Sequence, residues 1–144
     1  EWINGQKNGK GYYQYEDGSR TPIEDADANE LIRRVAAELG FEKKEFSNDE
    51  ILKRCLYPLI NTGAKLLSEG HALRAGDIDT VYVNGYGFPK YTGGPMWFAD
   101  TQGLENVLND IERFYKETGD DLWRPAELLK TLARDGRTFA SLDT

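Results

Sequence analysis

The amino-acid sequence predicts a mostly α-helical protein. In several segments, apolar residues recur at the 3.6-residue spacing of a helix, and residues that start or stop helices bracket these segments. The dense alternation of apolar and polar residues that is typical of strand-rich proteins is not seen along the chain. With 144 residues, 39% of them hydrophobic and 30% charged, the chain can build one globular domain with a substantial core.

The net charge and the cysteine content exclude several classes of partner. Acidic residues outnumber basic ones by 25 to 18, and the resulting charge of −7 repels nucleic-acid phosphates and anionic lipid headgroups. No apolar run reaches the roughly 20 residues that a membrane-spanning helix needs. The single cysteine, Cys55, excludes an intrachain disulfide. Since the chain does not begin with Met, we interpret it as a piece of a longer protein.

Residues 1–22 are predicted to form an extended arm from the preceding part of a parent protein, and residues 23–144 a helical domain. Within the arm, "YYQY" is expected to be extended and Asp17-Gly18 to form a turn. The arm is rich in aromatic residues, Trp2 among them, so we expect it to lie against a surface of this domain or of a missing part.

The clearest predicted helix follows a capping box formed by Ser47 and Glu50 and ends at Gly70. Pro58 inside it predicts a kink, and Gly63 predicts the close approach of another helix. Its apolar stripe comprises Leu52, Cys55, Leu56, Leu59, Ile60, Gly63, Leu66 and Leu67. The other helices are expected at about residues 23–39, 75–84, 95–100, 104–118 and 125–134.

The corner "NGYGFPKYTGGP", Asn84 to Pro95, is the first candidate site. It is not a dinucleotide-binding loop, because Lys90 stands where G-x-G-x-x-G needs its third glycine and a helix, not a strand, precedes it. A weaker possibility is an anion or substrate site at the following helix start, with Lys90, Gly93 and Gly94 as binding residues. Packing is the favoured interpretation, because the glycines allow positive φ and the prolines stiffen the turn.

No catalytic or metal-binding constellation is visible. His71 follows a predicted helix end, where a cation is favoured without any catalytic role. Cys55 is interpreted as a small buried hydrophobic residue. Asp77 and Asp79 are two residues apart on a helix, so they point about 200° apart, and helix-start stabilisation explains them better than a shared site. One cysteine and one histidine cannot supply a four-ligand zinc site of that type.

The run from Ile51 to Leu104, with "EGHALRAGDID" followed by "GYGFPKYTGGPMWFAD", resembles the C-terminal helical domain of 3-hydroxyacyl-CoA dehydrogenases. More narrowly, it is similar to the second, degenerate helical repeat of the multifunctional enzymes of fatty-acid β-oxidation. The arm from Asn4 to Pro22 resembles the segment that joins the first repeat to the second. The resemblance implies an all-α domain that braces the dehydrogenase domain, closes the acyl-CoA site or mediates assembly.

The resemblance also implies that catalysis lies elsewhere. The NAD site and the catalytic His and Glu belong to an upstream domain, so no NAD and no catalytic residue is expected in this chain. Lys53 stands where the first repeat has a catalytic Asn, and Asn61, about two turns later, is not that residue. The implied partners are the upstream dehydrogenase domain and the first repeat, with acyl-CoA and a homo-oligomer left open. The implied location is the cytoplasm, or the peroxisome in a eukaryote.

Two rival functions stay open. A stand-alone noncatalytic dimerisation module is favoured by the aromatic residues near the corner, which are Tyr86, Tyr91, Trp97 and Phe98. A stand-alone acyl-CoA carrier would need a basic patch for the CoA phosphates, and only the scattered Lys65, Arg74 and Lys90 are present.

Overall fold

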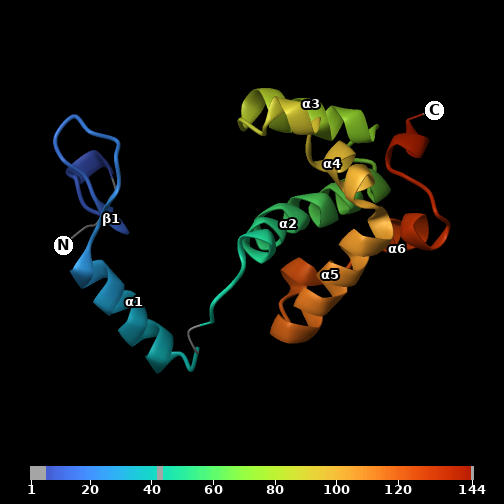
Figure 1. Ribbon diagram of the computed structural model, residues 1–144. Helices are drawn as coiled ribbons and strands as arrows, with labels where there is room; N and C mark the ends of the chain where they lie inside the picture. The colour runs from blue at the N-terminus through green and yellow to red at the C-terminus, as the bar shows by residue number, and fades with distance from the viewer. Residues whose placement is uncertain (1–5, 42–43, 144) are drawn as a thin grey trace. The chain divides into compact units, whose positions relative to one another are not determined.

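The computed structural model of the chain describes residues 6–41 and 44–143, and it divides the chain into two compact units, residues 1–45 and residues 46–144 (Figure 1). The sequence divided the chain differently, between residues 22 and 23. In the structure, the helix that follows the arm belongs to the same unit as the arm. The predicted surface contact of Trp2 lies outside the described residues.

The first unit is a small hairpin followed by a helix. Strands β1 (Tyr13–Gln14) and β2 (Ile23–Glu24) pair antiparallel, with Tyr13 opposite Glu24, after the 3-10 turn η1 (Gln6–Asn8). The expected turn between the strands is confirmed, since Gly18 has a φ of 77° and the Ser19 amide donates to the Glu16 carbonyl.

Helix α1 (Ala26–Glu38) begins later than the sequence predicted. Ile23 and Glu24 are paired with β1, and the first helical turn is capped by Asp25. The Asp25 Oδ1 accepts hydrogen bonds from the amides of Asp27 and Ala28, at 3.0 and 3.3 Å. An aspartate is a strong N-cap, so it sets the start of the helix at the residue after it.

The second unit is built from helices, which confirms the predicted mostly α fold. Its helices are α2 (Asn48–Ser68), α3 (Ala75–Gly85), α4 (Pro95–Gln102), α5 (Leu104–Thr118) and α6 (Glu127–Arg134). Short 3-10 turns lie between and after them: η2 (Lys90–Thr92), η3 (Asp121–Trp123) and η4 (Ala140–Leu142). Helix α2 is central, because it packs against α3, α4, α5 and α6.

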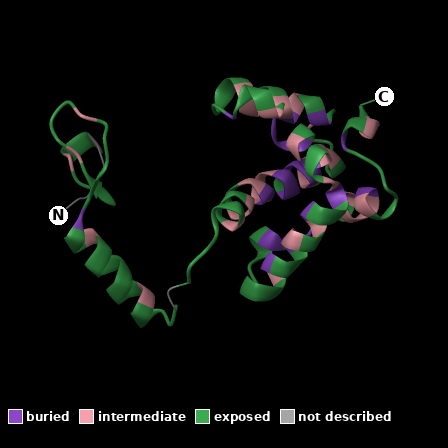
Figure 2. Ribbon diagram, in the orientation of Figure 1, coloured by how far each residue is buried: buried purple, intermediate pink, exposed green. Residues whose placement is uncertain are grey.

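The core of the second unit is formed where α2 meets α4, α5 and α6, and Figure 2 shows the buried residues gathered along these helices. Gly63 of α2 is needed there, since a Cβ at this position would lie 2.5 Å from the Met96 Sδ of α4. The predicted close approach of a helix at Gly63 is therefore confirmed. The Ser47 hydroxyl caps α2 by accepting from the Glu50 amide at 3.2 Å, and the Glu50 carboxylate pairs with Arg54.

Asn61 is a second fixed point of this core. Its amide is fully buried on α2 and spans the loop before α6. The Nδ2 donates to the carbonyls of Leu122 and Arg124, at 3.2 and 2.9 Å, and the Oδ1 accepts from the Ala126 amide at 2.8 Å. Asn61 thus pairs three backbone groups, of which the Ala126 amide is buried and would otherwise lack a partner.

Candidate functional site

The helix start at the corner, which the sequence marked as a candidate anion site, already holds a carboxylate. The amides of Met96 and Trp97, in the first turn of α4, donate to the two oxygens of Asp79 at 2.7 and 3.0 Å. Asp79 belongs to α3 and reaches this helix start from the side. A bound anion would have to displace a negative side chain from the same amides, which favours the packing interpretation of the corner.

The two corner glycines are required by close packing. Gly93 and Gly94 have φ angles of 76° and 109°, a region that L-residues rarely adopt. A Cβ on Gly94 would lie 2.5 Å from the Cβ of Asp79, and one on Gly93 would lie 2.5 Å from Cδ1 of Trp97. Lys90, the third predicted substrate residue, lies exposed at the start of η2. The substrate role of these three residues stays a prediction.

Asp79 is one member of a closed ring of three aspartate caps. Asp79 of α3 caps α4; Asp100 of α4 accepts from the amides of Phe139 and Ala140, at 2.8 and 3.0 Å. Asp143 accepts from the amides of Ala75 and Gly76, at 2.9 and 3.2 Å, and so returns to the start of α3. The ring ties α3, α4 and η4 together at their ends.

The ring also affects ionisation. Burial raises the pKa of Asp79, and the charges of Asp100 and Asp143 raise it further, while the two amide hydrogen bonds act in the opposite direction. The local reading of Asp77 is confirmed, since its Oδ2 accepts from the Arg74 amide at 3.2 Å. The sequence predicted that Asp79 stabilises the start of its own helix, α3. In the structure it stabilises the start of α4 instead, and no local sequence pattern predicts that contact.

His71 and Cys55 do not form a site. The His71 ring is largely exposed beyond the end of α2, with Nε2 3.5 Å from the Glu69 carboxylate. Cys55 is exposed on α2, so its predicted burial is wrong. Within residues 6–41 and 44–143, no group of three or more histidine, cysteine or acidic side chains is placed to hold a metal ion. None of the helices in this part of the chain combines the length and apolar character needed to cross a membrane.

The predicted apolar stripe of α2 is only partly buried. Of its predicted members, Leu52 is 59% exposed and Cys55 is also exposed, whereas Ile60 is fully enclosed. Ile51, which precedes Leu52 and was not in the predicted stripe, is exposed as well. The stripe is wider than the surface that the neighbouring helices cover, so its first half forms an outward apolar face. We call Ile51, Leu52 and Cys55 the α2 face. Contiguous exposed apolar residues of this kind are typical of interaction surfaces.

A polar pocket of about 370 Å³ lies where α2 meets the end of α4 and α5. Lys53 lines it, and the Lys53 Nζ lies 3.0 Å from Asp49 and 3.1 Å from Asp110. These two carboxylates raise the pKa of Lys53, which keeps the ammonium charged. The sequence singled out Lys53 only through the family resemblance. The spacing of Asp49, Lys53 and Tyr57, four residues apart on one helix, was the available signal.

An ion-pair network holds α2 against α5 beside this pocket. Arg54 pairs with Glu50 on its own helix and with Glu117 on α5. Arg113 of α5 contacts Asp110 and Glu117, each at 3.1 Å. The Arg54 guanidinium also lies over the Phe114 ring, 4.1 Å from its centroid. The helices that frame the pocket are thus held in a fixed relation.

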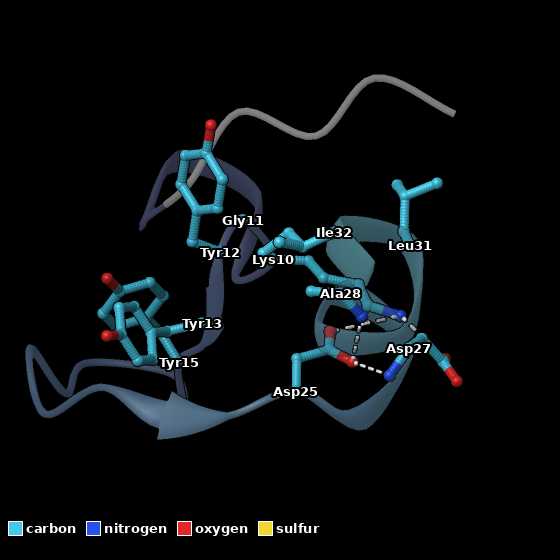
Figure 3. A pocket seen from close by; sticks show the side chains of 10 residues that line it. All are labelled: Lys10, Gly11, Tyr12, Tyr13, Tyr15, Asp25, Asp27, Ala28, Leu31 and Ile32. Carbon is cyan, nitrogen blue, oxygen red and sulfur yellow. Dashed lines mark hydrogen bonds and ion pairs between the residues drawn. The ribbon is translucent and has the colours of Figure 1, made fainter. Parts of the chain in front are cut away.

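The first unit contains a larger, mostly apolar pocket of about 780 Å³ between the hairpin and the first turns of α1, shown in Figure 3. Tyrosines from the hairpin and Leu31 and Ile32 of α1 line it. Asp25 lies at its base, 1% exposed, with Oδ2 3.7 Å from the Lys10 Nζ. The hairpin of the predicted arm therefore lies against a helix of its own unit.

Comparison with known families and proteins adds independent information. The chain matches the family described as "3-hydroxyacyl-CoA dehydrogenase, C-terminal domain" over residues 51–140. A shorter match, to the MORN repeat, covers residues 1–20. The peroxisomal bifunctional enzyme of Homo sapiens is 41% identical over 134 residues, which cover 92% of this chain and 18% of that enzyme.

A bacterial relative and a solved structure agree with this. The fatty acid oxidation complex subunit alpha of Idiomarina loihiensis is 37% identical over 138 residues, covering 94% of this chain and 18% of that subunit. The crystal structure of the dehydrogenase part of multifunctional enzyme 1 from C. elegans has a TM-score of 0.63 and 31% identity, covering 88% of this chain and 29% of that one. The chain thus spans less than a fifth of the length of these curated relatives.

Proposed function

The chain belongs to the family of 3-hydroxyacyl-CoA dehydrogenase C-terminal domains, and we propose that it is the noncatalytic packing domain of a larger, NAD-dependent dehydrogenase of fatty-acid β-oxidation. The family and the helical fold that the corner motif indicated are confirmed. In the proposed parent, NAD binds upstream of this chain and would accept the hydride when the 3-hydroxyl of an acyl-CoA is oxidised. The isolated chain is expected to form no NADH.

The α2 face is the observation that supports a packing role. Ile51, Leu52 and Cys55 are exposed on a helix whose other side is anchored in a tight core. The matched region is only 18% of the human relative, so most of that protein is available to cover such a surface. We infer that the α2 face packs against the first helical repeat or the dehydrogenase domain of the same polypeptide.

The native mass and activity of the protein test the proposal. We expect immunopurification through an epitope in this chain to recover a species several times heavier than 16.3 kDa that forms NADH from a 3-hydroxyacyl-CoA. A native species near 16.3 kDa would contradict the proposal. The name of the human relative leads us to infer a peroxisomal location if the source is eukaryotic. For a bacterial source we propose the cytoplasm.

A charge on the α2 face tests the packing role itself. Leu52→Asp is expected to lower the melting temperature of the full-length enzyme but not that of the isolated chain, because the leucine is exposed in the chain alone. Thr62→Asp, at an exposed position of the same helix, is the matched control and is expected to change neither. Equal effects of Leu52→Asp in both contexts would contradict a role in packing against the parent.

A noncatalytic dimerisation module is the second candidate, favoured by the exposure of Tyr86, Tyr91 and Trp97 around the corner. Sedimentation of the native species separates the two functions. A dimer of 16.3-kDa chains without dehydrogenase activity would favour the module, whereas a heavy, active polypeptide favours the packing domain.

A further inference from the structure

The polar pocket between α2 and α5 is a built site on rigid elements. Asp49, Lys53 and Tyr57 project from successive turns of α2, and Asp110 faces them from α5. Lys53 is held by both carboxylates, and Asp110 is also held by Arg113. Groups fixed in this way lose little conformational freedom when they bind a ligand.

Tyr57 supplies a hydroxyl to this pocket. The residue is only 2% exposed, and it lines the pocket. Burial raises the pKa of its hydroxyl, and Asp49, Lys53 and Asp110 line the same pocket. No hydrogen bond of the Tyr57 hydroxyl is seen among the described residues, and the hydroxyl is not one of their fully buried polar atoms that lack a partner, so it is open to the pocket. A tyrosine hydroxyl can both donate and accept a hydrogen bond, so this group is available to a bound molecule.

The charges of the pocket select an uncharged ligand. Lys53 is flanked by two carboxylates, so these three groups together carry a net charge of −1, which repels anions. The ammonium itself fills the place between the carboxylates that a cation would take. An ammonium has three N–H donors, and the two carboxylates account for two of them. The third donor and the Tyr57 hydroxyl can both bind a carbonyl oxygen.

The rim of the pocket complements an amide. Gln102 at the end of α4 and Asn106 and Asn109 on α5 are exposed carboxamides that line it. The Asn106 Nδ2 donates to the Gln102 carbonyl at 2.9 Å, which leaves its side-chain oxygen to accept. Carboxamides offer both donors and acceptors, and a secondary amide offers one N–H and one carbonyl to match them.

We propose that the pocket formed by Lys53, Tyr57, Asp110 and the three carboxamides binds an uncharged ligand segment that carries secondary amides. The carbonyl of the ligand lies against Tyr57 and Lys53, and its N–H lies toward the carboxamides. The site is distinct from the α2 face and does not depend on the packing role. Two sources supply this chemistry: the pantetheine arm of a CoA thioester and an extended polypeptide.

Titration of the ¹⁵N-labelled chain tests the site directly, because the side-chain NH₂ signals of Gln102, Asn106 and Asn109 are visible by NMR. Pantetheine, kept reduced, and N-acetylglycine N-methylamide serve as the two probes. We expect at least one of them to shift these signals in a saturable way. Tyr57→Phe removes one hydroxyl and is expected to weaken the affinity about fivefold. Tyr82→Phe removes the hydroxyl of a partly buried tyrosine outside the pocket and is expected to leave the affinity unchanged.

The outcomes show whether the pocket binds an amide ligand at all and, if it does, which of the two sources supplies that ligand. Saturation by pantetheine alone supports the site with a CoA-derived ligand, and saturation by the peptide probe alone supports it with a polypeptide ligand. No saturable shift up to the solubility limit of either probe overturns the proposal and leaves solvent as the partner of Tyr57. Equal affinity of the wild type and Tyr57→Phe also overturns it. If Tyr57→Phe fails to fold, Asn109→Ala, at an exposed position, replaces it with the same expected direction.

Discussion

In residues 46–144, Ile60, Ile111 and Phe114 are fully enclosed by neighbouring helices, whereas every described apolar side chain of residues 1–45 remains at least partly exposed. Among residues 7–41, 44 and 45, Asp25 alone is buried. The second unit therefore has a core of its own. The first unit consists of a hairpin and an amphipathic helix capped by Asp25, and its described residues form no buried apolar core.

The difference shows what each region needs in order to be stable. A helix of 13 residues, the length of α1, is only marginally stable in water without tertiary packing. A hairpin whose two strands have two residues each is also marginally stable on its own. The apolar residues Leu31, Ile32 and Val35 of α1 are correctly spaced for a core but meet none within their unit. Local sequence signals suffice to define such elements, while stability requires buried surface.

The largest expected effect comes from breaking the polar anchor of the second unit. Asn61→Ala leaves the buried Ala126 amide without a partner and removes two further hydrogen bonds, to the carbonyls of Leu122 and Arg124, so we expect a loss of about 3 kcal/mol in the free energy of unfolding. Urea denaturation measures it. Asn84→Ala, at an exposed asparagine of α3, is the control, with a change of about 0.5 kcal/mol or less. A similar effect of both variants would contradict the anchor role.

The corner is expected to show the next largest effect. Gly94→Ala forces a side chain into a positive-φ position 2.5 Å from Asp79, and we expect a loss of about 2 kcal/mol. In the proposed full-length enzyme, the combined change of Gly93 and Gly94 to Ala then tests the substrate role of the corner. Reduced stability with an unchanged KM for the acyl-CoA substrate supports packing, whereas a raised KM at unchanged stability supports binding.

The ion-pair network predicts a smaller, pH-dependent effect. The Arg54 hydrogen bond and the nearby Arg113 lower the pKa of Glu117. A lowered folded-state pKa contributes stability above the unfolded-state value, and this stability is lost as the pH falls through the lowered pKa. Because Glu117 is partly exposed, Glu117→Gln is expected to cost only about 0.5–1 kcal/mol at pH 7.

The cost of Glu117→Gln should shrink toward zero on acidification. Denaturation of both proteins across the acidic pH range measures this trend. Glu112→Gln, at an exposed position of the same helix, is the matched control and is expected to stay within about 0.5 kcal/mol of the wild type at pH 7. A cost of Glu117→Gln that persists unchanged at low pH would show that the charge of Glu117 is not its cause.

The smallest effect is expected in the first unit. Leu31→Ala should change the unfolding free energy of the isolated chain by about 0.5 kcal/mol or less, because the leucine is already exposed. Hydrogen exchange provides the complementary measurement, with α1 amides exchanging much faster than those around Ile60. Equal protection of the α1 and α2 amides from exchange would contradict the prediction, because it would show that α1 is as stable as the helices of the core.

Particular residues show how far the sequence alone predicts the fold and the site. The Ser47 cap, the turn at Asp17-Gly18 and the close approach at Gly63 were all predicted, since each depends on a local pattern. The helix start near residue 23 was misplaced, because Asp25 is a stronger cap than the acidic run suggested. The burial of Cys55 was wrong, since a stripe of apolar residues does not reveal how much of it the neighbouring helices cover.

The sequence by itself determined the helical class, most helix boundaries and, through the corner motif, the family. Only the tertiary structure assigned Asp79 to the start of α4, Asn61 to the loop before α6, and Lys53 and Tyr57 to a shared polar pocket. The physical reason is range. Caps, turns and periodicity are decided within a few residues along the chain, whereas these contacts join residues 17 to 65 positions apart. Such contacts form only after the helices have packed.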